Sequence, residues 1–206
     1  MNTHWKYIAT ATAFQELYGH FYANEAEMKA GYAKYVLQRN QEVRMAEHWQ
    51  IASPQHLQKT GVRFYHNYFN IRPEIPGQIY WLIRPDKDPA SWGSLVPNAN
   101  GYTLQTGWCR LIDNKFTVSL PKTAGDHCCQ AFATVINNAI APIPGPAKME
   151  GTKYDLGSCL DGEIRLVTKR APEADSQPGK IVRMITLLMD YSASGNSDIL
   201  QTVITL

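Results

Sequence analysis

The sequence lacks the short motifs that identify many enzymes. It contains no G-x-x-x-x-G-K-[ST], G-x-G-x-x-G, G-x-S-x-G or H-E-x-x-H, so no P-loop, dinucleotide-binding turn, nucleophile elbow or zinc-protease helix is indicated. Asp86 and Asp88 are the only acidic pair near a predicted strand end, and such a pair in a loop more often stabilises a turn. The familiar enzyme classes therefore find no support in the motifs.

Charge and long apolar runs are sparse as well. Only 18% of the 206 residues are charged, and the formal net charge is +2. The twenty Lys and Arg are scattered, with adjacent ones only at Lys169 and Arg170. We therefore expect no nucleic-acid partner, because clustered positive charge supplies affinity for phosphates. No stretch approaches the about 20 apolar residues that span a bilayer, and residues 1–17 lack the apolar run of a signal peptide.

Helical periodicity covers the first 60 residues. Thr12 with Gln15 matches a capping box, and Asn24 with Glu27 matches a second one, so two helices are predicted to begin there. Apolar and aromatic residues then recur at the spacing of one helical face. We expect this stripe to be buried in an interface of the assembled protein, and its main members are Phe14, Leu17, Phe21, Tyr32, Tyr35 and Trp49.

From residue 62 onward the apolar period shortens from near 3.6 to 2, which indicates β-strands. Residues 78–84 are apolar on both faces, and so are residues 181–191, for which we expect a central place in the sheet with Leu187 in the core. One helix is predicted near 125–141, beginning at Gly125. Strands are predicted at 62–71, 78–84, 102–112, 115–120, 162–169, 180–191 and 198–206, with a turn at Asp113-Asn114 and a long loop over 86–101.

Helices followed by a run of strands form an α+β pattern. We expect an α+β fold in which a helical N-terminal segment precedes a mostly antiparallel β-sheet of about six to seven strands with one inserted helix. Two parts are predicted. Residues 1–60 form the helical segment, which packs on the sheet or on a neighbouring subunit, and residues 61–206 form the β-rich domain.

Cys128 and Cys129 are the strongest candidates for a nucleophile. A cysteine in the first turn of a helix is stabilised as the thiolate by the positive end of the helix dipole. No histidine follows them, which excludes the order of cysteine before histidine found in papain-like and NlpC-like hydrolases. His66 is therefore the candidate base, and Asp86 is the residue that would orient it.

The order of His66, Asp86 and Cys128 resembles that of ubiquitin-like-protein-specific and adenoviral cysteine proteases. The resemblance covers these positions alone and implies a cysteine hydrolase or acyltransferase, with the cysteine opening a helix. Those families carry glycine directly after the nucleophile, where this chain has Cys129 or Gln130, and a glutamine before it, which residues 122–125 do not supply. Because this chain lacks that glycine and that glutamine, the resemblance does not identify an oxyanion donor.

Two further interpretations concern the same cysteines. Cys129 lies on an apolar stripe with Phe132 and Ile136, which predicts a buried and unreactive thiol. Zinc prefers ligands separated by two to four residues, and adjacent ligands do not meet that spacing, so we expect no metal. The residues of suitable type are His127, Cys128, Cys129 and Cys159.

Missing motifs, low charge and abundant aromatic residues favour a non-catalytic structural or interaction subunit that self-associates, a class that includes viral and phage particle components. A cysteine hydrolase or acyltransferase with His before Cys stays open as an alternative, as does an effector or immunity-type protein-binding module. We expect a homo-oligomer or larger assembly and no cofactor, with a further protein partner left open. A soluble protein made in the cytosol is expected, and a virion location stays open.

Overall fold

The computed structural model describes residues 10–52, 76–108, 111–142, 150–160 and 163–206. Its contacts divide the chain into two compact units, Met1–Arg44 and Met45–Leu206, which are described separately. The predicted strand at 62–71 and the predicted boundary near residue 60 lie outside the described residues.

The first unit is a pair of helices with a short 3-10 turn between them. α1 (Ala11–Tyr18) continues into η1 (Gly19–Phe21), and α2 (Glu25–Glu47) follows, with its last residues in the second unit. The predicted cap at Asn24 is confirmed, because its side chain accepts from the Glu27 N–H at 3.0 Å. The Glu27 side chain accepts from the Ala23 N–H at 3.2 Å, one residue before the N–H that a capping box uses. The first box was wrong by two residues, since Thr10 caps α1 by accepting from the Ala13 N–H at 3.2 Å.

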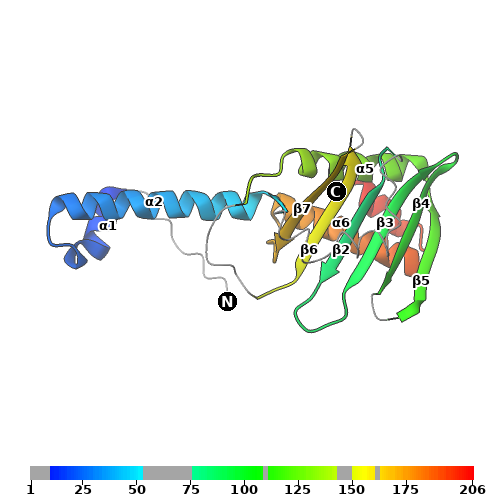
Figure 1. Cartoon of the computed structure of the whole chain (residues 1–206), viewed down its shortest axis with the longest axis horizontal. Coiled ribbons are helices and arrows are strands. Elements are labelled where there is room, and N and C mark those ends of the chain that lie inside the picture. The colour runs from blue at the N-terminus through cyan, green and yellow to red at the C-terminus, as the bar shows by residue number, and fades with distance from the viewer. Residues whose placement is uncertain (1–9, 53–75, 109–110, 143–149, 161–162) are drawn as a thin grey trace. The chain divides into compact units, whose positions relative to one another are not determined.

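The second unit is built on a seven-stranded sheet in which all neighbouring strands are antiparallel. The order across the sheet is β1-β7-β6-β2-β3-β4-β5. The strands are β1 (Gln50–Ile51), β2 (Ile79–Arg84), β3 (Ser91–Asn98), β4 (Gly101–Trp108), β5 (Leu111–Leu120), β6 (Lys153–Leu160) and β7 (Glu163–Arg170). The expected α+β class, with a helical segment before an antiparallel sheet, is confirmed (Figure 1).

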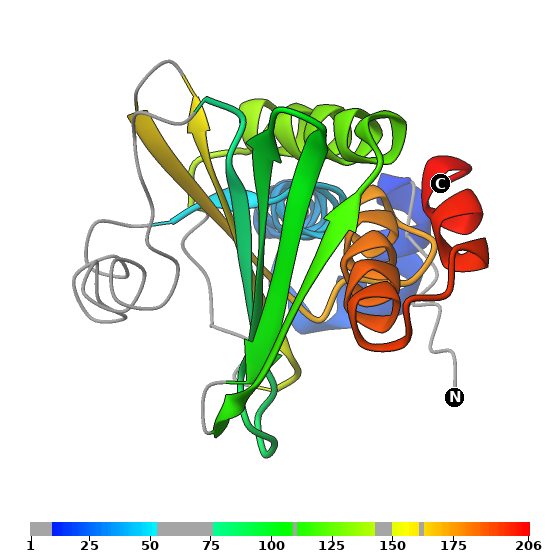
Figure 2. The ribbon, with the colours of Figure 1, turned by 90° about the vertical axis from the view of Figure 1, so that its right-hand side faces the viewer.

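Three helices lie over one face of the sheet (Figure 2). α5 (Lys122–Asn137) and α6 (Gln177–Ser194) contact the strands, and α7 (Asp198–Ile204) packs on both of these helices. β2 supplies apolar side chains to both faces, as predicted: Trp81 faces the helices and Tyr80 the opposite side, and both are at most 1% exposed. Gly93 lies beside the Trp81 ring, where a Cβ would come within 2.2 Å of it, so this position of β3 needs glycine.

The two predicted C-terminal strands were wrong, because 180–191 and 198–206 form α6 and α7. The buried residues Ile181, Ile185, Leu188 and Ser192 repeat every three or four positions, which is the spacing of one helical face. Apolar residues also occupy the flanks of that face, and the run therefore looked apolar on both sides of a strand. Leu187 was chosen as the core marker but is half-buried, whereas Leu188 is fully buried.

Three local boundaries also differ from the prediction. β3 runs through the segment expected to be a loop over 86–101. Asp113 and Asn114 lie within β5 and not in a turn. The inserted helix begins at Lys122, three residues before the predicted start at Gly125. Gly125 is instead a packing position, since a Cβ there would lie 2.0 Å from the Tyr102 ring.

A lysine from the sheet closes the C-terminal end of α2. Lys169 on β7 is 7% exposed, and its ammonium donates to the backbone carbonyls of Met45, Ala46 (2.8 Å) and His48 (3.2 Å). The last carbonyls of a helix have no partner within it, and a cation suits the negative end of the helix dipole. Burial lowers the pKa of Lys169 to about 8. Across the described residues, none of the helices has the length and apolarity needed to cross a bilayer.

Candidate interaction surface

Large apolar side chains are exposed mainly on the first unit. Leu17, Tyr18 and Phe21 lie on α1 and η1 and are 56%, 41% and 73% exposed. Phe21 follows Tyr18 and Leu17 by three and four residues, a spacing that brings side chains to neighbouring positions on a helix, and we call these three residues the apolar patch. Five of the eight exposed large apolar residues described in the chain belong to this unit: Leu17, Tyr18, Phe21, Leu37 and Val43.

Phe14 lies one turn before Tyr18 on the same face of α1 and is buried against α2. Phe14 is 4% exposed, and its ring centroid lies 5.1 Å from that of Tyr18 and 5.4 Å from those of both Tyr32 and Tyr35. Rings at such separations attract one another in tilted or offset arrangements. α2 therefore covers the part of this face that carries Phe14, while Leu17, Tyr18 and Phe21 remain exposed.

Acidic and basic side chains are equal in number over residues 10–44 of the first unit. Pairing within α2 includes Lys29 with Glu25 at 2.7 Å and Arg39 with Glu42 at 2.5 Å. The hydrogen bond from Lys29 lowers the pKa of Glu25, and the bond to Glu42 raises the pKa of Arg39. Residues 10–44 carry four basic and four acidic side chains, Lys29, Lys34, Arg39 and Arg44 against Glu16, Glu25, Glu27 and Glu42.

The six residues predicted as an interface fall into three groups. Phe14 is buried within the first unit, and Tyr32 and Tyr35 are half-buried around it. Trp49, only 2% exposed, belongs to the second unit and packs in the core on the helix side of the sheet. Leu17 and Phe21 remain exposed, and their burial in an assembly stays a prediction.

The two cysteines lie in the second turn of α5, beyond the first-turn N–H groups that stabilise a thiolate. Cys128 is fully buried, and burial raises its pKa to about 12. Cys129 is half-buried, its thiol donates to the Gly77 carbonyl at 3.7 Å, and burial raises its pKa to about 11. Both shifts run opposite to the lowered pKa of a reactive cysteine.

Asp86, which the cysteine-enzyme alternative needs to orient the histidine, has other partners. The Asp86 carboxylate accepts from the Gly151 N–H at 2.5 Å and lies 3.4 Å from an Arg170 nitrogen, so it anchors a loop. His66 lies outside the described residues. Its pairing with either cysteine stays a prediction.

Metal binding has no visible site in the part of the chain that the structure describes, where no three His, Cys, Asp or Glu side chains group together. His127 and the two cysteines of α5 therefore lack further ligands among those residues, and the Cys159 side chain lies outside them.

Comparison with protein-family models, with curated proteins and with solved structures found no match for this chain. The functional argument therefore rests on the surface and contacts described above.

Proposed function

We propose that this chain is a non-catalytic interaction subunit that self-associates, and that the apolar patch is the contact between two copies. The observation that carries the proposal is the exposure of Leu17, Tyr18 and Phe21 within five residues of α1 and η1. Apolar and aromatic side chains are enriched at the centres of protein interfaces, whereas charged ones are depleted there.

The size of the first unit supports association. Among its described residues only Phe14 and Met28 are buried apolar side chains. A unit of this size gains little from its own core, and oligomerisation is one of the usual ways in which small units become stable. Covering the apolar patch would stabilise the helices as well as the complex.

A second copy of the chain fits the patch better than a charged partner does. Residues 1–44 carry five basic and four acidic side chains, and a net charge of +1 neither repels an identical unit strongly nor attracts a strongly charged partner. A two-fold contact would place Leu17, Tyr18 and Phe21 against the same residues of the other copy, because such interfaces are self-complementary.

The test is sedimentation equilibrium over a range of concentrations with two matched variants. Phe21→Ser removes the most exposed apolar side chain of the patch, and Ile204→Ser removes a 37% exposed one from α7 in the other unit. Full burial of a phenylalanine contributes about 1.5–3 kcal/mol. Because Phe21 is 73% exposed, the substitution should remove about 1–2 kcal/mol of association free energy per copy. For a symmetric dimer this is about 2–4 kcal/mol, or roughly a 30- to 700-fold rise in Kd.

We expect the parent to be oligomeric. Phe21→Ser should associate more weakly while keeping its helix content, and Ile204→Ser should associate as strongly as the parent does. A monomeric parent at all concentrations contradicts the proposal, and so does equal weakening by both variants. Binding of a monomeric parent to lipid vesicles would assign the patch to a membrane surface instead. The finer proposal, a viral or phage particle component, predicts large assemblies in the same measurement.

A further inference from the structure

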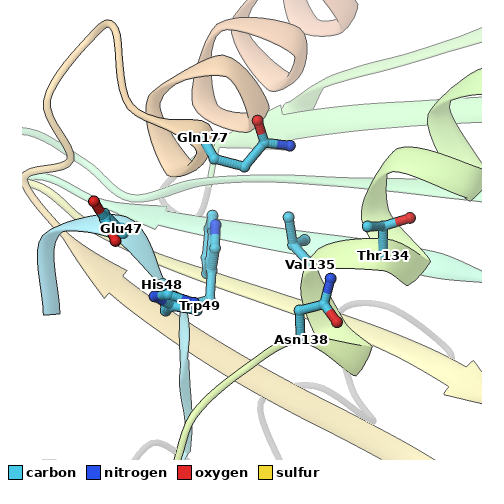
Figure 3. A pocket seen from close by; sticks show the side chains of 7 residues that line it. All are labelled: Glu47, His48, Trp49, Thr134, Val135, Asn138 and Gln177. Carbon is cyan, nitrogen blue, oxygen red and sulfur yellow. The ribbon is translucent and has the colours of Figure 1, made fainter. Parts of the chain in front are cut away.

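The two edges of the seven-stranded sheet differ. β1, at one edge, has two residues, and the segment after α5 closes it: the Ile51 N–H donates to the Ile140 carbonyl and the Ile140 N–H to the Trp49 carbonyl, both at 2.9 Å. Beside this closed edge lies a cavity of about 330 Å³, lined in part by Trp49, Val135 and Gln177 (Figure 3). β5, at the other edge, has ten residues and pairs with β4 alone among the described strands (Figure 1).

The outer side of β5 carries backbone groups that the chain does not use. Residues of an edge strand direct their N–H and C=O groups alternately toward the neighbouring strand and outward. The Ser119 carbonyl accepts from the Tyr191 hydroxyl of α6 at 3.0 Å, so Ser119 points outward. By alternation the backbone groups of Thr117 and Lys115 also point outward, and those of Phe116 point toward β4. The described residues supply no hydrogen-bond partner for the outward groups of Lys115 and Thr117.

This edge lacks the usual protection against pairing. Natural edge strands are commonly short, or carry proline, a bulge or an outward lysine. β5 is ten residues long and contains no proline, and the register shift of the β4–β5 pair lies between Thr106 and Trp108. Its lysine leans inward across the sheet, because the Lys115 ammonium lies 6.0 Å from the ring centroid of Trp92 on β3. Lys115 and Thr117 are both exposed, so a partner strand has access to this stretch.

An aromatic pair lies at the same edge, on the helix side of the sheet. Phe116 is half-buried and lies opposite Thr106, whose hydroxyl contacts that of Ser192 on α6 at 2.6 Å. The Phe116 ring meets the ring of Trp108 edge to face, with centroids 6.1 Å apart, and Trp108 is 38% exposed. A strand added to β5 would therefore cover apolar surface as well as backbone groups.

We propose that β5 pairs antiparallel with β5 of a second copy, about a two-fold axis at Phe116. In this register Lys115 of each copy lies opposite Thr117 of the other, and the two pairs form four backbone hydrogen bonds. The two Phe116 rings lie opposite each other in a non-hydrogen-bonded pair, where side chains approach most closely. The register uses the open groups of Lys115 and Thr117 and leaves the Ser119 carbonyl to Tyr191.

This contact goes beyond the one at the apolar patch, because it belongs to the second unit and is made by backbone hydrogen bonds. Each of the two contacts is self-complementary. A chain with two different two-fold contacts links more than two copies, since every copy can use both. Pairing of β5 therefore leads from a dimer to a larger assembly.

Amide hydrogen exchange in the full chain, followed by NMR at low and high protein concentration, tests the pairing. The Lys115 and Thr117 amides should exchange fast in dilute protein and about tenfold or more slowly in concentrated protein. The Phe116 amide bonds to β4 in both states and is the internal control. Exchange at Lys115 and Thr117 that stays fast in the associated protein overturns the proposal. Exchange that is slow at every concentration also overturns it, because another part of the chain would then cover the edge.

Charge variants in sedimentation equilibrium test the register. Thr117→Lys places lysines opposite each other at both pairs, and like charges directly opposite destabilise a ladder, so the Kd should rise about 2- to 30-fold. Adding Lys115→Glu to Thr117→Lys makes the opposite charges complementary and should restore the association. Thr186→Lys adds the same charge at an exposed position of α6 and should have no effect. Unchanged association in Thr117→Lys, or no recovery in the double variant, overturns the proposal.

Phe21→Ser distinguishes this contact from the apolar patch. Weakening by Thr117→Lys in the Phe21→Ser background supports β5 pairing, whatever the patch contributes. Weakening by Phe21→Ser with no effect of Thr117→Lys supports the patch and overturns β5 pairing. A parent that is monomeric at all concentrations overturns both proposals.

Discussion

Replacing Lys169 with methionine tests how the end of α2 is held. The ammonium donates to three backbone carbonyls in a position that is 7% exposed. A hydrogen bond to a charged group contributes about 1.5–3 kcal/mol, and a buried acceptor left without a donor costs about 1–3 kcal/mol. Methionine avoids the cost of burying a charge, which offsets part of the loss. We expect Lys169→Met to lower the free energy of unfolding by about 2 kcal/mol at pH 7.

The pH dependence of that effect has a definite sign. Burial lowers the pKa of Lys169 to about 8 in the folded chain, from its ordinary value of 10.5. Between these two values the unfolded chain holds a proton that the folded chain has released. Unfolding then takes up a proton and becomes less favourable as the pH rises. The stability of the parent relative to Lys169→Met should therefore increase between pH 8 and pH 10.5.

Urea unfolding of the parent, Lys169→Met and Lys180→Met at several pH values measures both effects. Lys180 is exposed on α6, so its replacement should be nearly neutral. A variant at position 169 as stable as the parent at pH 7 would show that the cost of burying the charge outweighs the three hydrogen bonds. If the stability of the parent relative to Lys169→Met fell with rising pH, the hydrogen bonds to the carbonyls would raise the pKa of Lys169 by more than burial lowers it.

Two further predictions follow from α6 and α5. Leu188→Ala should lower the free energy of unfolding in urea by about 2–5 kcal/mol, because Leu188 is fully buried. Leu187→Ala should lower it by less than half as much, because Leu187 is half-buried. A larger loss for Leu187→Ala than for Leu188→Ala would contradict the assignment of the buried face of α6. Cys128 and Cys129 should be alkylated slowly at neutral pH, since burial raises both pKa values. Mass spectrometry measures the rate, and rapid alkylation of either cysteine at pH 7 would support the enzyme alternative.

Signals confined to a few neighbouring residues predicted the structure well. The capping box predicted at Asn24 and Glu27 depends on residues three positions apart, and the structure contains its cap, the bond from the Glu27 N–H to the Asn24 side chain. The strands β2 and β7 were also found, because their apolar patterns and flanking turns are local. The α+β class followed from the order of such signals along the chain.

Errors arose where apolar residues are dense or where packing decides. The sequence of α6 contains signals for both ends of a helix. Ser176 caps its start, Pro178 lies in its first turn, and Gly195 follows its end in the left-handed region at φ 68°. A short run apolar on every side cannot be assigned to helix or strand by period alone, and these end signals were the better guide. β3 was missed because Gly93 and Ser94 break its apolar alternation, and their place in the strand depends on the neighbouring β2 side chains Trp81 and Tyr80.

The apolar patch and the cavity differ in how much of each could be predicted from the sequence. Helical spacing identified the stripe that includes Phe14, Leu17 and Phe21, but which members face inward depends on where α2 folds back against α1. The cavity joins Trp49, Val135 and Gln177 from distant parts of the chain, and no local period connects them. Trp49 was predicted to lie at an interface, and it is buried in the core of the second unit, just after the end of α2. The contacts of this side chain become visible only in the fold, because the residues around it come from distant parts of the sequence.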